Sequence, residues 1–298
     1  MTDTIRGYGF ISLPILGWGL APIFVDLGLN YIGVLTFFSY RFILAFLLTF
    51  PFILMTKWNQ VKILLKNPWT YIVASAHAWA LLSQYFSQLY ISPSISATIS
   101  YSYLILVPFI SSLLLGTKVS KRHIFTVILA ILGVLMMVTE GKLSVFQTNP
   151  IGIIFAGLST IGFAFYITSV SRLLNKEVAG ADSLSLYIII VGIVSIVGIV
   201  LSLSFGGNLN PLDIPNSGWF YISLLSLIST IMAYSAYIQS LKYLSPNTAS
   251  VLLLLQIVIP FIIEGAFGVA YSLWVFAGGF IVIVASFLVI TGSDTSLH

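Results

Sequence analysis

The chain has 298 residues, of which 59% are hydrophobic and 7% are charged, whereas about 25% are charged in an ordinary soluble domain. So few charged side chains cannot cover a water-soluble globule of this length, and a mean hydropathy of +1.08 indicates that lipid surrounds most of the chain. The net charge of +4 is spread too thinly to form a basic stripe for nucleic acid, and the absence of cysteine excludes disulfides and thiolate chemistry.

Ten apolar runs are long enough to cross a bilayer as helices. A spanning helix needs about 20 apolar residues, because the hydrocarbon core is about 30 Å thick. The runs lack the two-residue alternation of a membrane β-barrel, and helices satisfy their own backbone hydrogen bonds in lipid. The sequence therefore predicts an all-α integral membrane protein with ten transmembrane helices at 8–25, 32–55, 69–90, 94–116, 122–139, 150–171, 183–203, 218–240, 244–266 and 272–291.

The positively charged residues fall almost entirely on one side of this topology. Short cytoplasmic loops retain Lys and Arg, so both termini are expected to be cytoplasmic and the protein to lie in the cell membrane. The first span is expected to be a retained helix, because its removal as a secretory signal would break the pattern. Lys142 lies on the opposite side and Arg41 within a span, whereas ten cations share the cytoplasmic side: Arg6, Lys57, Lys62, Lys66, Lys118, Lys121, Arg122, Arg172, Lys176 and Lys242.

Short motifs of the first half recur in the second half, two of them at offsets of 153 and 152 residues. The Tyr-x-Ser-Pro run at 90–93 returns at 243–246, and the Pro-Phe-Ile run at 108–110 returns at 260–262. The Gly-Trp pair at 17–18 aligns with the Gly-Phe pair at 162–163. This duplication predicts two five-helix repeats, at residues 1–145 and 146–298. Because five is an odd number, the second repeat is expected to be inverted, as in many secondary transporters.

Three runs and three single residues carry a resemblance to a known family. The runs are Gly-Trp-Gly-Leu-Ala-Pro-Ile-Phe at 17–24, Leu-Tyr-Ile-Ser-Pro-Ser-Ile-Ser-Ala at 89–97 and Tyr-Leu-Ser-Pro-Asn-Thr-Ala-Ser at 243–250, and the residues are Arg41, Pro108 and Pro260. With them the chain resembles the EamA-type members of the drug/metabolite transporter superfamily over essentially its whole length. It departs from many members at 115–117, which read Leu-Gly-Thr instead of Leu-Gly-Glu. The resemblance implies ten helices, cytoplasmic termini and transport of amino acids, sugars, nucleotide-linked sugars or other metabolites.

Polar side chains on the third span form a stripe in a segment that would otherwise face lipid. His77, Gln84 and Gln88 are spaced by seven and four residues, which puts them on one helical face. Ionisable groups within a span cost about 2.5–3.5 kcal/mol on insertion scales and therefore need partners or an aqueous cavity. A buried histidine is often only hydrogen-bonded to a neighbour. The resemblance implies a pathway role, because amino-acid exporters of the superfamily have a histidine of the third span in their central cavity.

Aromatic residues inside the spans complete the predicted substrate site. A tyrosine ring can stack on a substrate while its hydroxyl donates a hydrogen bond. Serine and threonine in membrane helices more commonly serve close packing and are not included. The predicted substrate-binding residues are His77, Gln84, Tyr101, Phe163, Tyr166, Tyr234, Trp18 and Gln256.

Arg41 in the second span and Glu264 in the ninth are the other ionisable groups considered for the pathway. Arg41 is expected to pair with Glu264, to bind helix-end carbonyls, or to hold a substrate carboxylate. Glu264 is also a candidate for proton coupling. Pro108 and Pro260 occupy equivalent positions and each removes a backbone donor, so they are expected to be either hinges or packing kinks.

These features together predict a secondary transporter that moves a small metabolite, above all an amino acid for export, by alternating access around a midplane cavity. No cofactor or metal is expected, and no phosphate-binding loop is present, so transport is downhill or driven by an ion gradient such as that of protons. Sugars, nucleotide sugars and lipid-like metabolites are alternative substrates. A channel or adaptor and a membrane-embedded enzyme are the other functional classes, and an enzyme would need clustered acids or His-Asp pairs that the sequence lacks.

Overall fold

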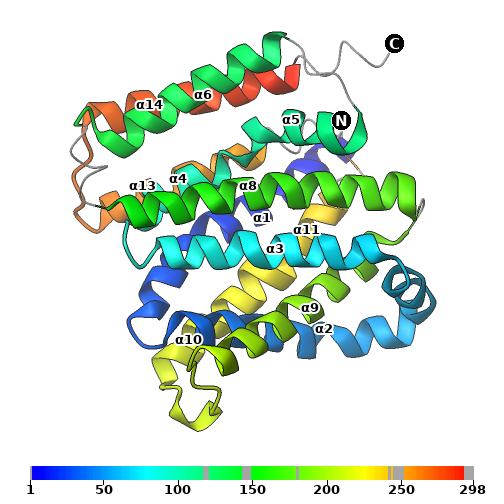
Figure 1. The fold of residues 1–298 in the computed structure, drawn as a ribbon. Coiled ribbons are helices and arrows are strands. Elements are labelled where there is room, and N and C mark those ends of the chain that lie inside the picture. The colour runs from blue at the N-terminus through cyan, green and yellow to red at the C-terminus, as the bar shows by residue number, and fades with distance from the viewer. Residues whose placement is uncertain are drawn as a thin grey trace.

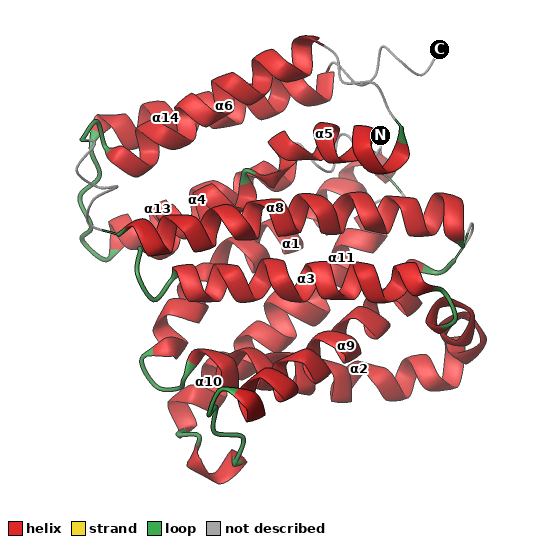
Figure 2. Ribbon diagram, in the orientation of Figure 1, coloured by secondary structure: helices red, strands yellow, loops and turns green. Residues whose placement is uncertain are grey.

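A computed structural model describes residues 2–116, 121–142, 149–178, 181–240, 243 and 252–291. These residues form helices joined by short connections and include no strand (Figure 2). The start of α1 and the end of α14 lie at the same end of the bundle (Figure 1). The helices are α1 (Thr2–Leu29), α2 (Val34–Leu65), α3 (Pro68–Ser87), α4 (Pro93–Tyr101), α5 (Tyr103–Leu115), α6 (Lys121–Thr139), α8 (Pro150–Arg172), η1 (Leu173–Glu177), α9 (Ser183–Ser204), η2 (Pro211–Asp213), α10 (Asn216–Leu224), η3 (Leu225–Met232), α11 (Ala233–Ser240), η4 (Leu254–Ile257), α13 (Val258–Ala266) and α14 (Leu273–Thr291).

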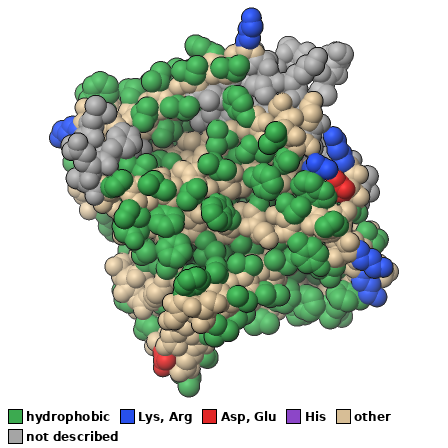
Figure 3. Space-filling model, in the orientation of Figure 1, with side chains coloured by type: hydrophobic (Ala, Val, Ile, Leu, Met, Phe, Trp, Pro, Cys, Tyr) green, Lys and Arg blue, Asp and Glu red, His purple; other side chains and the backbone are tan. Residues whose placement is uncertain are grey.

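The surface of the bundle is that of a membrane protein. Hydrophobic side chains are spread over the whole face seen in Figure 3, while most of the Lys and Arg side chains visible there lie toward one end. Five helical stretches of the described residues are long and apolar enough to cross a bilayer: Ile5–Leu29, Val34–Leu65, Pro150–Val170, Ser183–Ser204 and Asn216–Tyr237. The predicted all-α, multi-pass membrane fold is thus confirmed, and the number of ten crossings stays a prediction.

Proline and capping side chains determine where two of the helices begin. Asn67 accepts a hydrogen bond from the backbone N–H of Trp69, and Pro68 is the first residue of α3. Ser92 caps α4 in the same way and is followed by Pro93. Proline suits this position because its missing N–H would have no partner in the first turn, while the cap satisfies another free donor. Both observed starts lie next to the predicted ones at 69 and 94.

The longest helix, α2, bends at Lys57, where the backbone leaves the helical conformation with φ −137° and ψ 19°. The helix then continues to Leu65, well beyond the predicted end of the span at 55. The Lys57 ammonium lies 2.5 Å from the carboxylate of Asp182, which also caps α9 by accepting from the backbone N–H of Ser185. This ion pair joins the bend in α2 to the start of α9.

Helices from the two halves of the chain pack against each other throughout the bundle. α2 lies along α9, α6 along α14, α3 along α8, and α1 along η3 and α11 (Figure 1). The first two pairs join helices that hold the same position in each half. The other two pairs join the third helix of one half to the first helix of the other. If each helix is replaced by the helix at the same position in the other half, the same four pairs result.

Two glycines that align in the sequence lie where helices of different halves approach each other closely. A Cβ atom on Gly162 of α8 would lie 2.9 Å from the Cα atom of Ala80 on α3. A Cβ atom on Gly17 of α1, which aligns with Gly162 in the sequence, would lie 3.0 Å from the carbonyl oxygen of Ile228 on η3. Glycine permits such contacts because it lets the backbones of membrane helices touch.

The fourth helix of each half is interrupted. α4 ends at Tyr101 and α5 begins at Tyr103, with Ser102 between them. In the second half a short 3-10 segment, Leu254–Ile257, precedes α13. Each interruption lies shortly before the proline of that helix, at 108 or 260, and a proline removes one backbone hydrogen bond to the preceding turn.

A few sequence predictions fall outside the described residues. They concern the beginning of the ninth span, the motif at 244–250, Lys118, Lys242 and the side chains of Pro108 and Arg122. Elsewhere the helices lie where the apolar runs predict them, except that α1 and α2 extend further at their ends. Hydropathy detects the part of a helix that lies in lipid, whereas the backbone hydrogen bonds continue into the polar boundary region.

Replacing Gly162 by Ala is expected to lower the melting temperature of the protein in detergent micelles, because the added methyl group would collide with Ala80. Overpacking of this kind costs about 1–3 kcal/mol. Gly157 on the same helix is the matched control, since a Cβ atom there meets nothing within 4 Å. Gly157→Ala should be neutral or stabilising through helix propensity. An equal loss of stability in both variants would contradict the close contact at Gly162.

The cap at Asp182 should make stability depend on pH. Burial raises the pKa of this carboxyl, but hydrogen bonds from Lys57 and Ser185 outweigh burial and hold the pKa below its ordinary value. Such a carboxyl stabilises the folded state above its unfolded pKa of about 4, and this stability is lost as the pH falls through the folded pKa. Asp182→Asn should therefore lower the melting temperature at neutral pH. The difference from the wild type should shrink in acid, and a constant difference at all pH values would refute the assignment.

Candidate functional site

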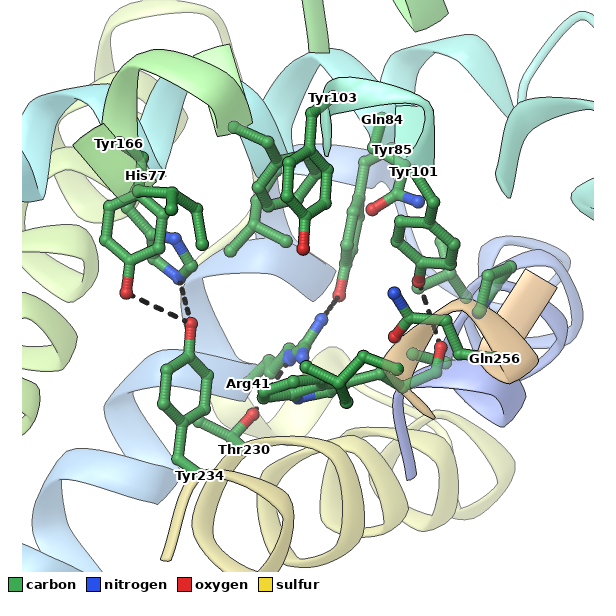
Figure 4. A pocket seen from close by; sticks show the side chains of 18 of the residues that line it. Arg41, His77, Gln84, Tyr85, Tyr101, Tyr103, Tyr166, Thr230, Tyr234 and Gln256 are labelled. Atoms are coloured by element: carbon green, nitrogen blue, oxygen red, sulfur yellow. Dashed lines mark hydrogen bonds between the residues drawn. The ribbon is translucent and has the colours of Figure 1, made fainter. Parts of the chain in front are cut away.

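A cavity of about 140 Å³ lies inside the bundle, between helices of both halves (Figure 4). Helices α1 to α5 line it from the first half, and α8, η3, α11 and the η4 region line it from the second half. Most of the lining is aromatic or aliphatic. The residues are Trp18, Ala21, Pro22, Val25, Arg41, Phe42, His77, Leu81, Gln84, Tyr85, Gln88, Tyr101, Tyr103, Phe163, Tyr166, Ile167, Thr230, Tyr234, Tyr237, Leu253 and Gln256.

Arg41 is the only Lys, Arg, Asp or Glu side chain in the described lining of the cavity, and it is 5% exposed. Its Nε atom donates to the hydroxyl of Thr230 at 3.0 Å, and Nη1 donates to the hydroxyl of Tyr85 at 2.9 Å (Figure 4). The guanidinium also lies 5.1 Å from the centre of the Phe42 ring. These contacts orient the guanidinium, but all three partners are neutral groups.

His77 belongs to an aromatic group at one side of the cavity. The hydroxyl of Tyr234 lies 3.3 Å from His77 Nε2 and 3.4 Å from the hydroxyl of Tyr166. The rings of His77 and Tyr166 are 4.3 Å apart, and Tyr187 stacks on Tyr234 from behind at 4.9 Å. This packing fixes the orientation of three polar atoms that face the cavity.

Trp18 and Tyr101 form another part of the wall. The indole N–H of Trp18 donates to the carbonyl oxygen of Ser229 at 3.0 Å, and the hydroxyl of Tyr101 donates to the carbonyl oxygen of Trp18 at 2.9 Å. Gln84 and Gln256 lie on the same side as Tyr101 in Figure 4, away from His77. The wall here therefore combines aromatic rings with two side-chain amides.

Several buried polar atoms of the lining have no hydrogen-bond partner among the described residues. They are Nδ1 of His77, the amide nitrogen of Gln84, both amide atoms of Gln88 and the amide oxygen of Gln256. A buried polar atom without a partner costs about 1–3 kcal/mol, so water or a bound polar molecule is expected to pair with these atoms. Gln88 also lines a second pocket together with Asp26 and Tyr90, and thus lies between the two pockets.

The structure brings all eight residues predicted to bind substrate to this one cavity: His77, Gln84, Tyr101, Phe163, Tyr166, Tyr234, Trp18 and Gln256. Their role in binding stays a prediction. Pro260, a predicted hinge residue, is buried in α13. Within the part of the chain that the structure describes, no three His, Asp or Glu side chains lie close enough together to hold a metal ion.

Of the three alternatives for Arg41, the pairing with Glu264 is not found in the structure. Glu264 accepts hydrogen bonds from the backbone N–H of Ser94 at 3.0 Å, from the Ser94 hydroxyl at 2.7 Å and from the hydroxyl of Tyr271. Ser94 lies in the first turn of α4, where free N–H groups and the helix dipole stabilise a negative charge. Glu264 of α13 thus caps α4. Its carboxylate is hydrogen-bonded there and does not form an ion pair with Arg41.

Tyr85 and Tyr103 line the cavity but are absent from the predicted set. Tyr85 lies about 80° around α3 from His77, so a narrow stripe of polar positions through His77 does not include Tyr85. On a continuous helix Tyr101 and Tyr103 would point about 200° apart. They reach the same cavity because the helix is interrupted at Ser102. A wider helical face would have identified Tyr85, but no local signal in the sequence marks the interruption.

Residues 5–139 match the model of the EamA-like transporter family. A relative, the uncharacterized transporter YyaM of Bacillus subtilis (strain 168), is 25% identical over 252 residues, which cover 83% of this chain and 81% of that protein. A protein of known crystal structure superimposes with a TM-score of 0.65 over 100% of this chain and 99% of its own, at 12% sequence identity. The last likeness shows the fold alone. The first two relate the chain to membrane transporters.

Glu264→Gln is expected to lower the melting temperature in detergent, because the amide NH₂ group would face the donors of Ser94. Hydrogen bonds to charged groups contribute about 1.5–3 kcal/mol, so the loss should be easily measured. Tyr271→Phe removes only one of the three hydrogen bonds to this carboxylate and should cost less. An unchanged melting temperature in Glu264→Gln would show that the carboxylate does not cap α4.

Proposed function

We propose that this chain is an EamA-like secondary transporter that moves a small metabolite, above all an amino acid for export, across the cell membrane. The match of residues 5–139 to that family and the transporter relative support the proposal. In this proposal two inverted repeats, residues 1–145 and 146–298, open a central cavity to each side in turn. Both termini are cytoplasmic, since the cations of the predicted topology lie on their side of the membrane.

The observation that carries the proposal is a cavity with several polar side chains in its lining, inside a bundle with an apolar outer surface. Arg41, His77 and Gln84 from the first half meet Tyr166 and Gln256 from the second half at this cavity. Polar and ionisable groups at membrane depth are costly and mark substrate pathways. Transporters with inverted repeats bind their substrates near the midplane, at the interface between the repeats.

Three structural features support the inverted repeat. The set of helix pairs is unchanged when the two halves are exchanged. Gly17 and Gly162, which align in the sequence, make close contacts through the corresponding pairs of helices. The interruptions at Ser102 and Leu254–Ile257 fall in the fourth helix of each half. Discontinuous helices beside the binding site are common in transporters of this architecture.

The interrupted helices are the proposed hinges of alternating access. A helix bends most easily where its hydrogen-bond ladder is broken. In this view Pro108 and Pro260 keep each ladder open by lacking a backbone N–H. Tyr101 lies next to the first interruption and Gln256 within the second, and both line the cavity, so bending there would move the binding site directly.

Coupling to a proton gradient is part of the proposal, with Glu264 as the carboxyl that binds the proton. A carboxylate accepts hydrogen bonds at both oxygens, and protonation turns one oxygen into a donor. Protonation would therefore weaken the contacts of Glu264 with Ser94 and Tyr271, which join α13 to α4. Separation of these helices would open one end of the bundle.

Purified protein in liposomes should exchange an external labelled amino acid for unlabelled amino acid inside. The panel should include sugars and nucleotides, and each solute should be tested with and without a proton gradient. Exchange of this kind requires a carrier that reorients with its substrate bound, whereas a channel gives flux without it. If no solute of the panel is exchanged, the transport proposal fails.

Tyr234→Phe should slow this exchange about two- to tenfold, because its hydroxyl hydrogen bonds are worth about 0.5–1.5 kcal/mol. The hydroxyl of Tyr234 is within hydrogen-bond distance of His77 and Tyr166 in the cavity wall. Tyr187→Phe is the matched control, since that tyrosine stacks on Tyr234 but its hydroxyl has no partner among the described residues. Equal slowing by both variants would attribute the effect to packing behind the cavity.

A further inference from the structure

We infer that the transported molecule carries a carboxylate, and that the guanidinium of Arg41 binds this carboxylate inside the central cavity. The inference rests on the proposed transport function and narrows its substrate class. Amino acids and simple carboxylic acids fit the cavity, whereas cations that lack a carboxylate do not. Arg41 is a substrate-binding residue in this account.

The Arg41 guanidinium has N–H groups that bond to no acceptor among the described residues. Of its five N–H groups, Nε uses one on Thr230 and Nη1 uses one on Tyr85. Neither N–H group of Nη2 has an acceptor among the described residues. The side chain is held in place by its two hydroxyl partners and by the Phe42 ring. A fixed guanidinium with free N–H groups is the geometry that binds a carboxylate through two parallel hydrogen bonds.

The positive charge of Arg41 is not neutralised by the described part of the protein. Two ion pairs occur there: Lys57–Asp182 joins the bend in α2 to the start of α9, and Arg172–Glu177 lies at the end of α8. Glu264 is engaged with Ser94 and Tyr271. A buried charge without a counter-ion is costly, and the attraction to an opposite charge is strongest where water is excluded. A bound carboxylate removes this cost, whereas a cationic ligand would increase it.

The rest of the lining suits the other parts of an amino acid. The amide oxygens of Gln88 and Gln256 are acceptors without partners and can receive the N–H groups of an ammonium. The ring of Trp18 lies 5.2 Å from Tyr234 and 5.6 Å from Tyr237, which gives an apolar side chain or an ammonium an aromatic surface. The site thus offers one anion-binding group and neutral groups around it.

Cavity size and charge disfavour larger anions. The volume of about 140 Å³ is small beside the roughly 300–1,000 Å³ typical of pockets for drug-sized ligands. Nucleotide-linked sugars carry several negative charges and are usually held by more than one cation, whereas the described lining has one guanidinium. A single carboxylate on a small molecule matches both properties.

Two series of analogues test the inference in the liposome exchange assay. The first contains L-phenylalanine, 3-phenylpropanoate, phenylalaninamide and 2-phenylethylamine, and the second contains L-leucine, 4-methylpentanoate, leucinamide and 3-methylbutylamine. In each series the first two compounds have the carboxylate and the last two lack it. The carboxylates should be exchanged, or inhibit exchange, at least about tenfold better than the matched compounds without one.

Arg41 variants identify the group responsible for this preference. Arg41→Gln should reduce the preference for carboxylates over amides to about onefold, whereas Arg41→Lys should keep part of it because the charge remains. A general loss of packing would slow all compounds alike and leave the ratio unchanged, so the ratio is the readout. Lys62→Gln, which removes an exposed cation outside the cavity, is the control and should behave like the wild type. If Arg41→Gln does not fold, Arg41→Lys alone tests the preference, which should then be smaller than in the wild type.

The outcomes separate this inference from the transport proposal. Exchange of the amides or amines as well as of the carboxylates overturns the inference and leaves transport standing. Exchange of sugars or nucleotides, with no exchange of any carboxylate compound, also overturns the inference and leaves transport standing. An unchanged carboxylate preference in both Arg41 variants also overturns it. If none of these solutes is exchanged at all, the transport proposal itself fails.

Discussion

The hydrocarbon core of a bilayer contains no water, so each polar group of this chain has to be satisfied by the protein or by a molecule that the protein binds. Most of the structure follows this constraint. The free N–H groups at the start of α4 receive the carboxylate of Glu264, and the hydroxyl of Ser226 bonds back to carbonyl oxygens of α2 and its own helix. At the central cavity the constraint is met only in part, since Arg41 has neutral partners and Gln88 has none among the described residues.

The same constraint explains how far the sequence predicts the fold. A helix in lipid must be apolar for about 20 residues, so apolar runs locate the helices. Their ends are less predictable, because a helix can continue into the boundary region at little cost. α2 shows this: the apolar run stops near residue 55, but the helix bends at Lys57 and continues to Leu65. The ion pair with Asp182 lies at this bend, and a partner so distant in the sequence leaves no local signal.

The spacing of polar and aromatic residues identifies much of the candidate site, because residues of one stripe lie on the same surface of a regular helix. His77 and Gln84 reach the cavity for this reason. Spacing fails as a guide where a helix is irregular: Tyr101 and Tyr103 both line the cavity, and the helix is interrupted between them at Ser102. The spacing of residues along the sequence also cannot identify which groups pair with a charged side chain. Arg41 bonds to Thr230, which lies 189 positions away, and Glu264 is held by the cap it provides to α4.

The contacts of Arg41 connect substrate binding to the movement of the two halves. Its side chain belongs to α2 in the first half, but Thr230 and Ser226, which contact its side chain and its backbone carbonyl, lie on η3 in the second half. η3 is a π-helical stretch, a wider turn that is often found at functional sites in helices. A carboxylate that binds the free N–H groups of the guanidinium leaves the bond from Nε to the Thr230 hydroxyl in place. In the proposed mechanism the substrate therefore binds to a side chain that already joins the two halves, at the place where they must separate for alternating access.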